Sequence, residues 1–268
     1  MDLFSLKNKV AIVTGACGLL GRMHCEALAE AGAQVVVADL DETTATAVTR
    51  QLEGDNHLGL GLDVSDPTSL EAARKKILGK YGRIDILVNN AAINDKFEDP
   101  LLAGRQSMFE HYPLDLWNKS WQVNVSGVFL CSQFFGTVMA EQGSGSIINI
   151  ASTYGIVAPD QSIYRDETGS QVFFKSPAYP VTKSAVIGFT RFLASYWGGR
   201  NVRVNALSPG GVENDQAVYF KNNYAAKTPL GRMASASDYK GAIVFLASEA
   251  SAYMTGANLV VDGGWTAI

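Results

Sequence analysis

A glycine-rich turn near the start of the chain places the strongest constraint on its fold. Gly15, Gly18 and Gly21 recur at every third position, directly after the apolar run Val10–Thr14. A helical pattern of apolar residues follows the turn and stops at Gly32. A glycine turn between a buried strand and a helix lets the backbone approach a pyrophosphate, which then lies at the helix N-terminus. The turn therefore predicts a dinucleotide-binding unit, in preference to glycines that serve only a tight bend.

The rest of the chain alternates short apolar runs with helical patterns in the same way. We expect strands over 10–14, 34–39, 58–63, 84–89, 146–152, 202–208 and 258–261, and the main later helices over 43–52, 66–81, 116–139, from 179 onward and over 238–248. Strands that alternate with helices form parallel sheets. We therefore expect an α/β fold: a Rossmann-type, doubly wound, seven-stranded and mainly parallel sheet with helices on both faces. No linker or repeat divides the 268 residues, which predicts one domain over 1–268.

Composition and charge exclude several classes of function. With a net charge of −4 and scattered Lys and Arg residues, the sequence predicts no basic patch that could bind nucleic acid. Three cysteines without metal-ligand spacing predict no metal site and a reduced, cytoplasmic setting, and the first residues lack the apolar region of a signal peptide. Residues 120–140 carry no charge, but Gln, Asn and Ser interrupt the apolar run. We expect a helix covered by the sheet and a partner subunit, and no membrane span.

An acidic residue ends the second expected strand. Asp39 can accept hydrogen bonds from the hydroxyls of an adenosine ribose, and its charge would repel a 2′-phosphate. Neither Cys17 in the turn nor the residues 40–42 supply a cation to hold such a phosphate. The sequence therefore favours NAD over NADP. The alternative role for Asp39 is that of a cap for the following helix.

A tyrosine and a lysine lie four residues apart in a later helix. Pro180 fits the first turn of that helix, so Tyr179 and Lys183 share one face. A nearby ammonium group favours a phenolate and lowers the pKa of the phenol. The pair is a plausible general acid/base for an alcohol or a carbonyl. Alone this spacing is most often accidental, and the dinucleotide turn is what gives it meaning.

Together with Asp39 and the glycine turn, Ser152, Tyr179 and Lys183 resemble the short-chain dehydrogenase/reductase family, in its single-domain branch. The resemblance implies hydride transfer between a substrate carbon and the nicotinamide. Tyr179 would exchange the alcohol proton, Lys183 would lower the pKa of the tyrosine and hold the nicotinamide ribose, and Ser152 would orient the substrate oxygen. Asn124 falls on the asparagine that in the family holds a proton-relaying water; the alternative is a bond to a helix carbonyl.

The same resemblance implies a larger set of cofactor contacts. They are Gly15, Gly18, Leu19, Leu20, Gly21, Asp39, Leu40, Asp63, Val64, Asn90, Ala91, Tyr179, Lys183, Pro209, Gly210, Val212 and Asn214. The chain departs from the family pattern where Leu19 and Ala92 replace glycines and Asn214 replaces a threonine. With Gly18 one position early, the turn is similar to that of the sugar-nucleotide branch.

Two segments, near 93–114 and 153–178, are longer than is usual in the family, and a flap is expected near 213–228. Both long segments leave the carboxyl ends of strands, where ligands bind in such sheets. We identify as candidates for recognising a polyhydroxylated or anionic substrate the residues Tyr154, Gln161, Arg165, Lys175 and His111. Each of these alone is more often a solvated surface residue.

The first hypothesis is an oxidoreductase that transfers a hydride between NAD and a secondary alcohol or ketone of a sugar, sugar acid or sugar derivative. A second is a reductase or dehydrogenase of an apolar ketone, such as a steroid or a 3-oxoacyl thioester. A third is a sugar-nucleotide epimerase or dehydratase with retained NAD, although only about 60 residues follow the sixth strand. A fourth is a non-catalytic dinucleotide sensor. The resemblance and the uncharged helix also imply a homotetramer or homodimer.

Overall fold

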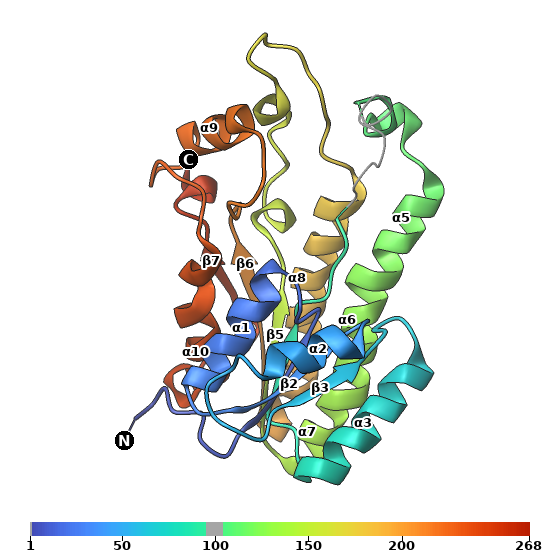
Figure 1. Cartoon of the computed structure of the whole chain (residues 1–268), viewed down its shortest axis with the longest axis vertical. Coiled ribbons are helices and arrows are strands. Elements are labelled where there is room, and N and C mark those ends of the chain that lie inside the picture. Colours follow the sequence, from blue (N-terminus) through green and yellow to red (C-terminus); the bar gives the residue numbers. More distant parts are fainter. Residues whose placement is uncertain (1, 95–103) are drawn as a thin grey trace.

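A seven-stranded sheet forms the centre of the protein, in a computed structural model that describes residues 2–94 and 104–268 (Figure 1). The strands follow the order β3-β2-β1-β4-β5-β6-β7, and every neighbouring pair is parallel. Their bounds are β1 Val10–Thr14, β2 Gln34–Asp39, β3 Leu58–Gly61, β4 Ile86–Asn89, β5 Gly145–Ile150, β6 Val202–Pro209 and β7 Asn258–Val261. The seven expected strands and the mainly parallel sheet are confirmed.

Helices cover both faces of this sheet. They are α1 Leu19–Glu30, α2 Glu42–Thr49, α3 Pro67–Tyr81, α5 Leu114–Trp121, α6 Gly127–Cys131, α7 Thr137–Gln142, α8 Ala178–Trp197, α9 Val218–Ala226 and α10 Lys240–Ala247. One hydrophobic core joins α3, α6, α7 and α8 to the sheet, and a second core on the opposite face joins α1, α2 and α10 to it. The fold is therefore the expected doubly wound Rossmann type.

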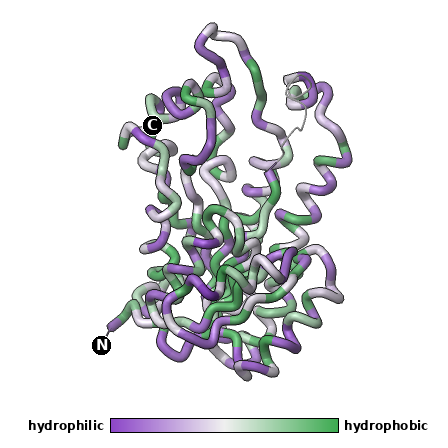
Figure 2. Tube along the Cα trace, viewed as in Figure 1, coloured by the Kyte–Doolittle hydropathy of each residue, from purple (hydrophilic) through white to green (hydrophobic). Residues whose placement is uncertain are grey.

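The buried strands explain why their sequences are apolar without interruption. Val10 and Ile12 of β1 face one core, whereas Ala11 and Val13 face the other. All four are at most 1 % exposed. Burying one such side chain stabilises the fold by up to about 1.5–3 kcal/mol. In a strand that is covered on both faces, every apolar residue therefore adds to the stability. Figure 2 shows the same distribution, with the hydrophobic residues gathered along the central strands.

Local polar groups set the ends of several elements. The Asp41 carboxylate accepts hydrogen bonds from the Thr43 and Thr44 N–H groups and so begins α2. The Asp66 side chain accepts from the Thr68 N–H at the start of α3, which has Pro67 in its first turn. β5 ends at Ile150, two residues before the expected end.

The apolar stretch after β4 forms one helix over Leu114–Gln142, longer than the expected 116–139. Two wide π-helical turns, Gln122–Ser126 and Ser132–Gly136, separate α5, α6 and α7. In the described part of the chain this helix alone is long and apolar enough to cross a membrane, yet 56% of its most apolar window is buried inside the protein. Its Phe135 and Met139 side chains lie fully buried in the core. It is a core helix of the fold.

Candidate active site

The carboxyl ends of the parallel strands meet at one edge of the sheet, and the connections that leave them enclose a cavity of about 300 Å³. Its walls come from the segments after β4, β5 and β6, from the start of α8 and from α9. Ser152, Tyr179 and Lys183 all line it. Residues that are 31 positions apart in the chain thus share one small space, as expected.

The three polar side chains are linked in a short chain of contacts. The Ser152 and Tyr179 side chains are hydrogen-bonded to each other. The Ser152 hydroxyl also accepts a 3.2 Å hydrogen bond from the Tyr154 N–H, which fixes its direction. The Lys183 ammonium lies 5.7 Å from the centre of the Tyr179 ring and donates to the Ile150 carbonyl at 2.7 Å. A hydroxyl, a phenol and an ammonium group therefore face one cavity.

Burial changes the acidity of these groups. It lowers the pKa of Lys183 to about 8, which leaves the amine mainly charged at neutral pH. It raises the pKa of Tyr179, and the hydrogen bond from Ser152 acts in the opposite direction. In the free protein the loss of solvent around the phenolate outweighs the Ser152 hydrogen bond, so the pKa of Tyr179 lies above its ordinary value. The lowering of this pKa by Lys183 stays a prediction.

Asn124 lies in the first wide turn and is 1 % exposed. Its Oδ1 accepts from the Ile93 N–H at 2.8 Å, and its Nδ2 donates to the Ile93 carbonyl at 2.9 Å and to the Thr182 hydroxyl at 3.2 Å. The amide thus joins the helix to the segment after β4 and to α8, instead of bonding a carbonyl of its own helix. A role in proton relay stays a prediction.

A second cleft of about 490 Å³ runs along the glycine turn. Its walls are formed by Gly15, Cys17, Gly18, Leu19, Leu20, Gly21, Asp39, Asn90, Ala91 and Ala92. Leu20, Asn90 and Ala92 also line the first cavity. The cleft and the cavity are therefore neighbours that share a wall.

The three glycines of the turn are required for different reasons. Gly15 has a φ of +60°, and a Cβ there would lie 2.7 Å from the Ala91 Cα. A Cβ on Gly21 would lie 2.2 Å from the Gly15 carbonyl oxygen. Gly18 would meet only that same oxygen, at 3.4 Å, and its φ is −74°. The fold needs Gly15 and Gly21, whereas Gly18 leaves space over the start of α1.

That space fits a dinucleotide. Gly18 is the N-cap of α1 and no side chain caps the helix there, so the first N–H groups are available to a phosphate. The Asp39 carboxylate accepts from the Cys17 and Leu40 N–H groups, each at 2.8 Å, and lines the same cleft. It does not cap the next helix, since Asp41 does so. Burial and the Asp39 charge raise the pKa of the Cys17 thiol to about 11, so no anionic thiolate forms in the turn at neutral pH.

The other residues proposed from the resemblance divide into two groups. Pro209, Gly210 and Val212 line the first cavity, and the Asn90 amide donates to the Thr14 and Gly15 carbonyls, which holds the turn in place. The second group lines neither space and comprises Leu40, Asp63, Val64 and Asn214.

The four residues of the second group lie at the surface or make contacts outside the cavity and the cleft. Leu40 is 75% exposed, and the Asp63 carboxylate accepts from Ser65. Val64 packs against the backbone of the long helix at Gly127. The Asn214 N–H donates to the Gln216 side chain, and it is Gln216 that reaches the cavity.

The substrate candidates are divided in the same way. Tyr154 and Lys175 line the cavity. Gln161 instead bonds the backbone of Lys175, through its Oε1 at 2.8 Å and its Nε2 at 3.3 Å. Arg165 is exposed, with its Nε donating to Gln171, and His111 is exposed in a short 3-10 turn. The segment 95–103 of the first insertion lies outside the described residues.

Sequence reasoning missed several residues that line the cavity: Asn94, Tyr164, Gln216, Phe220, Tyr224 and Met233. The first two lie in the two insertions, and Gln216, Phe220 and Tyr224 lie in the expected flap. The sequence thus predicted the segments that border the cavity, but not which of their side chains face into it. An aromatic residue in a loop gives no periodic signal, so only the folded loop reveals its direction.

The second insertion and the flap pack on one another above the sheet (Figure 1). Lys227 forms an ion pair with Asp160, and the Asn223 amide donates to the carbonyls of Ile163 at 3.2 Å and Arg165 at 3.0 Å. The Tyr164 and Phe220 rings meet with their centres 5.2 Å apart. We refer to these contacts between residues 160–165 and 220–227 as the clasp.

Known proteins resemble this chain over its full length. Residues 15–266 match the family described as enoyl-(acyl carrier protein) reductase. The D-threitol dehydrogenase of Mycolicibacterium smegmatis is 38% identical over 270 residues, which cover 98% of this chain and 95% of the relative. The 2-dehydro-3-deoxy-D-gluconate 5-dehydrogenase of Dickeya dadantii is 34% identical, with 100% and 99% covered.

A solved structure agrees with these sequence matches. The gluconate 5-dehydrogenase of Burkholderia cenocepacia, in complex with NADP and tartrate, superposes with a TM-score of 0.86. It is 31% identical and covers 100% of this chain and 98% of its own. The chain is thus a member of the short-chain dehydrogenase/reductase family, an NAD(P)-dependent oxidoreductase that acts on CH–OH groups of a small-molecule substrate.

Proposed function

We propose that this protein interconverts a secondary alcohol and a ketone of a polyol, sugar or sugar acid, with NAD as the preferred cofactor. The observation that carries the proposal is the meeting of Ser152, Tyr179 and Lys183 in a cavity that shares a wall with the glycine-turn cleft. A sensor without catalytic activity would not need these three groups together.

Each side chain has a distinct task in alcohol oxidation. The Ser152 hydroxyl donates to the substrate oxygen and orients it between itself and Tyr179. The Tyr179 phenolate accepts the hydroxyl proton as general base, and in reduction the phenol returns it. Lys183 places a positive charge beside the phenolate and would hold the nicotinamide ribose. When bound, NAD supplies the hydride acceptor at its nicotinamide ring.

The cofactor contacts extend this assignment along the cleft. Gly15, Gly18 and Gly21 with Leu19 and Leu20 would border the diphosphate, and Asp39 would accept from the adenosine ribose hydroxyls. A carboxylate at that position disfavours the 2′-phosphate of NADP, which supports NAD. The Burkholderia cenocepacia relative holds NADP, and a comparison of NAD with NADP in kinetic assays tests the preference.

The polar lining of the cavity supports a hydroxylated substrate. Asn94, Tyr154, Lys175 and Gln216 surround the catalytic serine and tyrosine with donors and acceptors. The names of the relatives include a four-carbon polyol and a sugar acid. A 3-oxoacyl thioester is the second candidate, because the family description names an acyl carrier protein and Phe220 and Met233 add apolar surface to the cavity.

A second copy of this chain is the partner we propose. Phe192 and Tyr196 of α8 are 60% and 68% exposed, and their stacked rings border a groove of about 610 Å³ between α8 and the long helix. Exposed apolar faces of this kind mark protein interfaces. We infer a homodimer or homotetramer, with one domain over 1–268. The free state of all three cysteines agrees with a cytoplasmic setting.

A substrate panel tests the proposed reaction. Polyols, sugars, sugar acids, hydrophobic alcohols and 3-oxoacyl thioesters are each supplied with NAD(H) or NADP(H), and nicotinamide absorbance is followed. We expect turnover of a polyol, sugar or sugar acid. Tyr179→Phe should lose at least about a thousandfold in kcat and still bind NAD. Near-normal turnover by Tyr179→Phe would disprove the assigned role of the phenol.

A further inference from the structure

The Tyr179 ring lies between two lysines, one four residues before it and one four residues after it. The Lys175 ammonium is 4.3 Å from the centre of the ring, closer than the 5.7 Å of Lys183. Lys175 also donates to the Asn94 Oδ1 at 2.6 Å and lies 5.9 Å from the Tyr154 ring. The phenol therefore has a second cation near it, supplied by the insertion before α8.

The insertion holds Lys175 in this position through its backbone. The Gln161 side chain accepts from the Lys175 N–H and donates to the Lys175 carbonyl. The Gln171 amide donates to the Gln161 and Phe173 carbonyls, each at 2.7 Å, which ties the two ends of the insertion together. A network of amide hydrogen bonds thus holds the backbone of Lys175, and the Asn94 side chain accepts from its ammonium group.

A cation over an aromatic ring is attracted to its negative face. The attraction is stronger for a phenolate, because the ring then carries a full negative charge. An opposite charge within about 4–6 Å favours the charged form of a group and moves its pKa by about 1–3 units. At Tyr179 this effect opposes burial, which raises the pKa of the phenol.

Other described groups near Tyr179 come from several elements. α8 contributes Lys183, the segment after β5 contributes Ser152 and Tyr154, and the insertion contributes Tyr164 in addition to Lys175. From α9, Tyr224 reaches the same cavity with its hydroxyl accepting from the Gly211 N–H.

We propose that Lys175 is a positioning residue that acts through Tyr179, as a second cation that favours the phenolate. Of the two ammonium groups, that of Lys175 lies nearer to the centre of the Tyr179 ring. The inference rests on the proposed function, in which the Tyr179 phenolate accepts the substrate proton. It assigns to the insertion a part in proton transfer in addition to substrate recognition.

The decisive measurement is a titration of Tyr179 itself, without substrate or cofactor. Tyrosinate absorbance is followed from about pH 8 to the highest pH at which both proteins stay folded, in the wild type and in Lys175→Met, and the same curves with Tyr179→Phe added to each are subtracted. The difference isolates Tyr179 from the other nine tyrosines. We expect Lys175→Met to move the Tyr179 titration upward by about one pH unit. Lys175→Arg should restore it.

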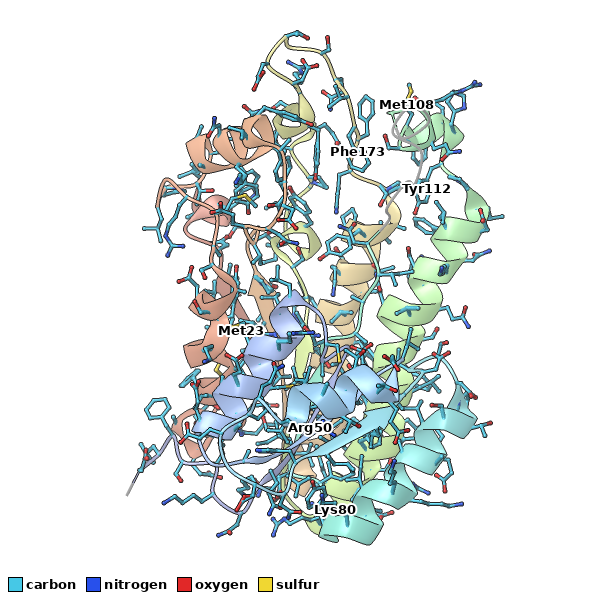
Figure 3. The ribbon with its side chains drawn as sticks, viewed as in Figure 1. Met23, Arg50, Lys80, Met108, Tyr112 and Phe173 are labelled. Carbon is cyan, nitrogen blue, oxygen red and sulfur yellow. The ribbon has the colours of Figure 1, made fainter. Side chains whose placement is uncertain are left out.

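The chain offers a matched control in Lys80→Met. The Lys80 ammonium lies 5.2 Å from the centre of the Tyr81 ring, at the opposite end of the molecule from Phe173 of the insertion (Figure 3). Its removal deletes the same charge over the same type of ring, and should leave the Tyr179 titration where it is. The acid limb of kcat/KM for alcohol oxidation should rise with Lys175→Met and not with Lys80→Met.

Two results would overturn the inference. One is an unmoved Tyr179 titration in Lys175→Met. The other is an unmoved acid limb with a raised KM for anionic substrates alone, which would make Lys175 a substrate contact. Retention of activity by Tyr179→Phe would defeat the proposed function instead, and the absorbance titration would still decide the effect of Lys175 on the phenol.

Discussion

The Lys183 ammonium and the Ile150 carbonyl oxygen are joined by a 2.7 Å hydrogen bond inside the protein, where Lys183 is only 4 % exposed. A buried ammonium group of this kind lowers the free energy of unfolding, because it has lost its hydration. Burial lowers the pKa of Lys183 from 10.5 to about 8, so between these values the unfolded chain binds more protons than the folded one. Stability from this group therefore rises as pH rises through that interval, and the full cost is present below about pH 8.

We expect Lys183→Met to be inactive yet more stable than the wild type at pH 7. Its free energy of unfolding should be higher by on the order of 2 kcal/mol, after the loss of the hydrogen bond to Ile150 is subtracted. The gap between the two proteins should narrow as pH rises from about 8 toward 10.5. Urea unfolding without cofactor at pH 7, 8, 9 and 10 measures it. A gap that stays constant with pH would show that the lysine is not the titrating group.

Gly18 and Gly21 should respond differently to the same substitution. Gly18→Ala has room for its methyl group, so its unfolding should match the wild type, but its affinity for NAD should fall by about tenfold or more because the methyl occupies the phosphate space. Gly21→Ala should be destabilised, because its Cβ meets the Gly15 carbonyl oxygen. Thermal unfolding and calorimetric NAD titration separate the two effects. Unchanged NAD affinity in Gly18→Ala would place the diphosphate elsewhere.

Asp39→Asn should shift the cofactor preference. The amide oxygen can still accept from the Cys17 N–H, but the charge that repels a 2′-phosphate is gone. We expect the ratio of kcat/KM for NADP to that for NAD to rise by about tenfold. Asp41→Asn removes an equal charge two residues away, and asparagine caps helices equally well, so this control should leave the ratio unchanged. A shift of equal size in both variants would mean that only net charge matters.

Breaking the clasp should weaken substrate binding. Asn223→Ala removes the donors to the Ile163 and Arg165 carbonyls and so weakens the contact between the insertion and α9. We expect a KM for the substrate several-fold higher and faster proteolysis within 156–175, with the NAD affinity less affected. The exposed neighbour Asn222→Ala is the control. If both variants have wild-type KM values, the insertion and the flap work independently.

Phe192→Glu should separate the subunits. The substitution puts a charge in the centre of the aromatic face of α8, where a second copy would otherwise exclude water. Analytical ultracentrifugation of the wild type should show a dimer or tetramer, and of Phe192→Glu a smaller species. Tyr253→Glu changes a fully exposed aromatic residue that is not part of this face and should have no effect. The same mass for all three proteins would remove α8 from the interface.

Features that depend on short spacings were predictable from the sequence. The glycine turn, the buried strands and the Tyr179–Lys183 pair each involve residues within a few positions of one another, and all of them fold as expected. Their joint position at the sheet edge followed from the rule that parallel strands end together.

Features that depend on distant partners were not predictable. Gln161 looked like a surface residue for substrate contact, but its amide matches the backbone of Lys175, fourteen residues later. Asn124 finds its partner in Ile93, in a separate segment. Neither pairing can be predicted from the neighbouring residues. A polar side chain in a loop can equally well form hydrogen bonds with solvent, with a ligand or with a distant peptide group.

The two wide turns of the long helix affect how its length can change. Each π turn holds one residue more than an ordinary turn of the same rise. In a regular helix an added residue rotates everything after it by about 100°, which would carry a core side chain to the surface. Here the extra residue is confined to its own turn, and Asn124 and Ser132 point inward from these turns, to Ile93 and Asn89. The helix thus accommodates a change in residue number without losing register with the sheet, so length variation in this region is compatible with an intact core.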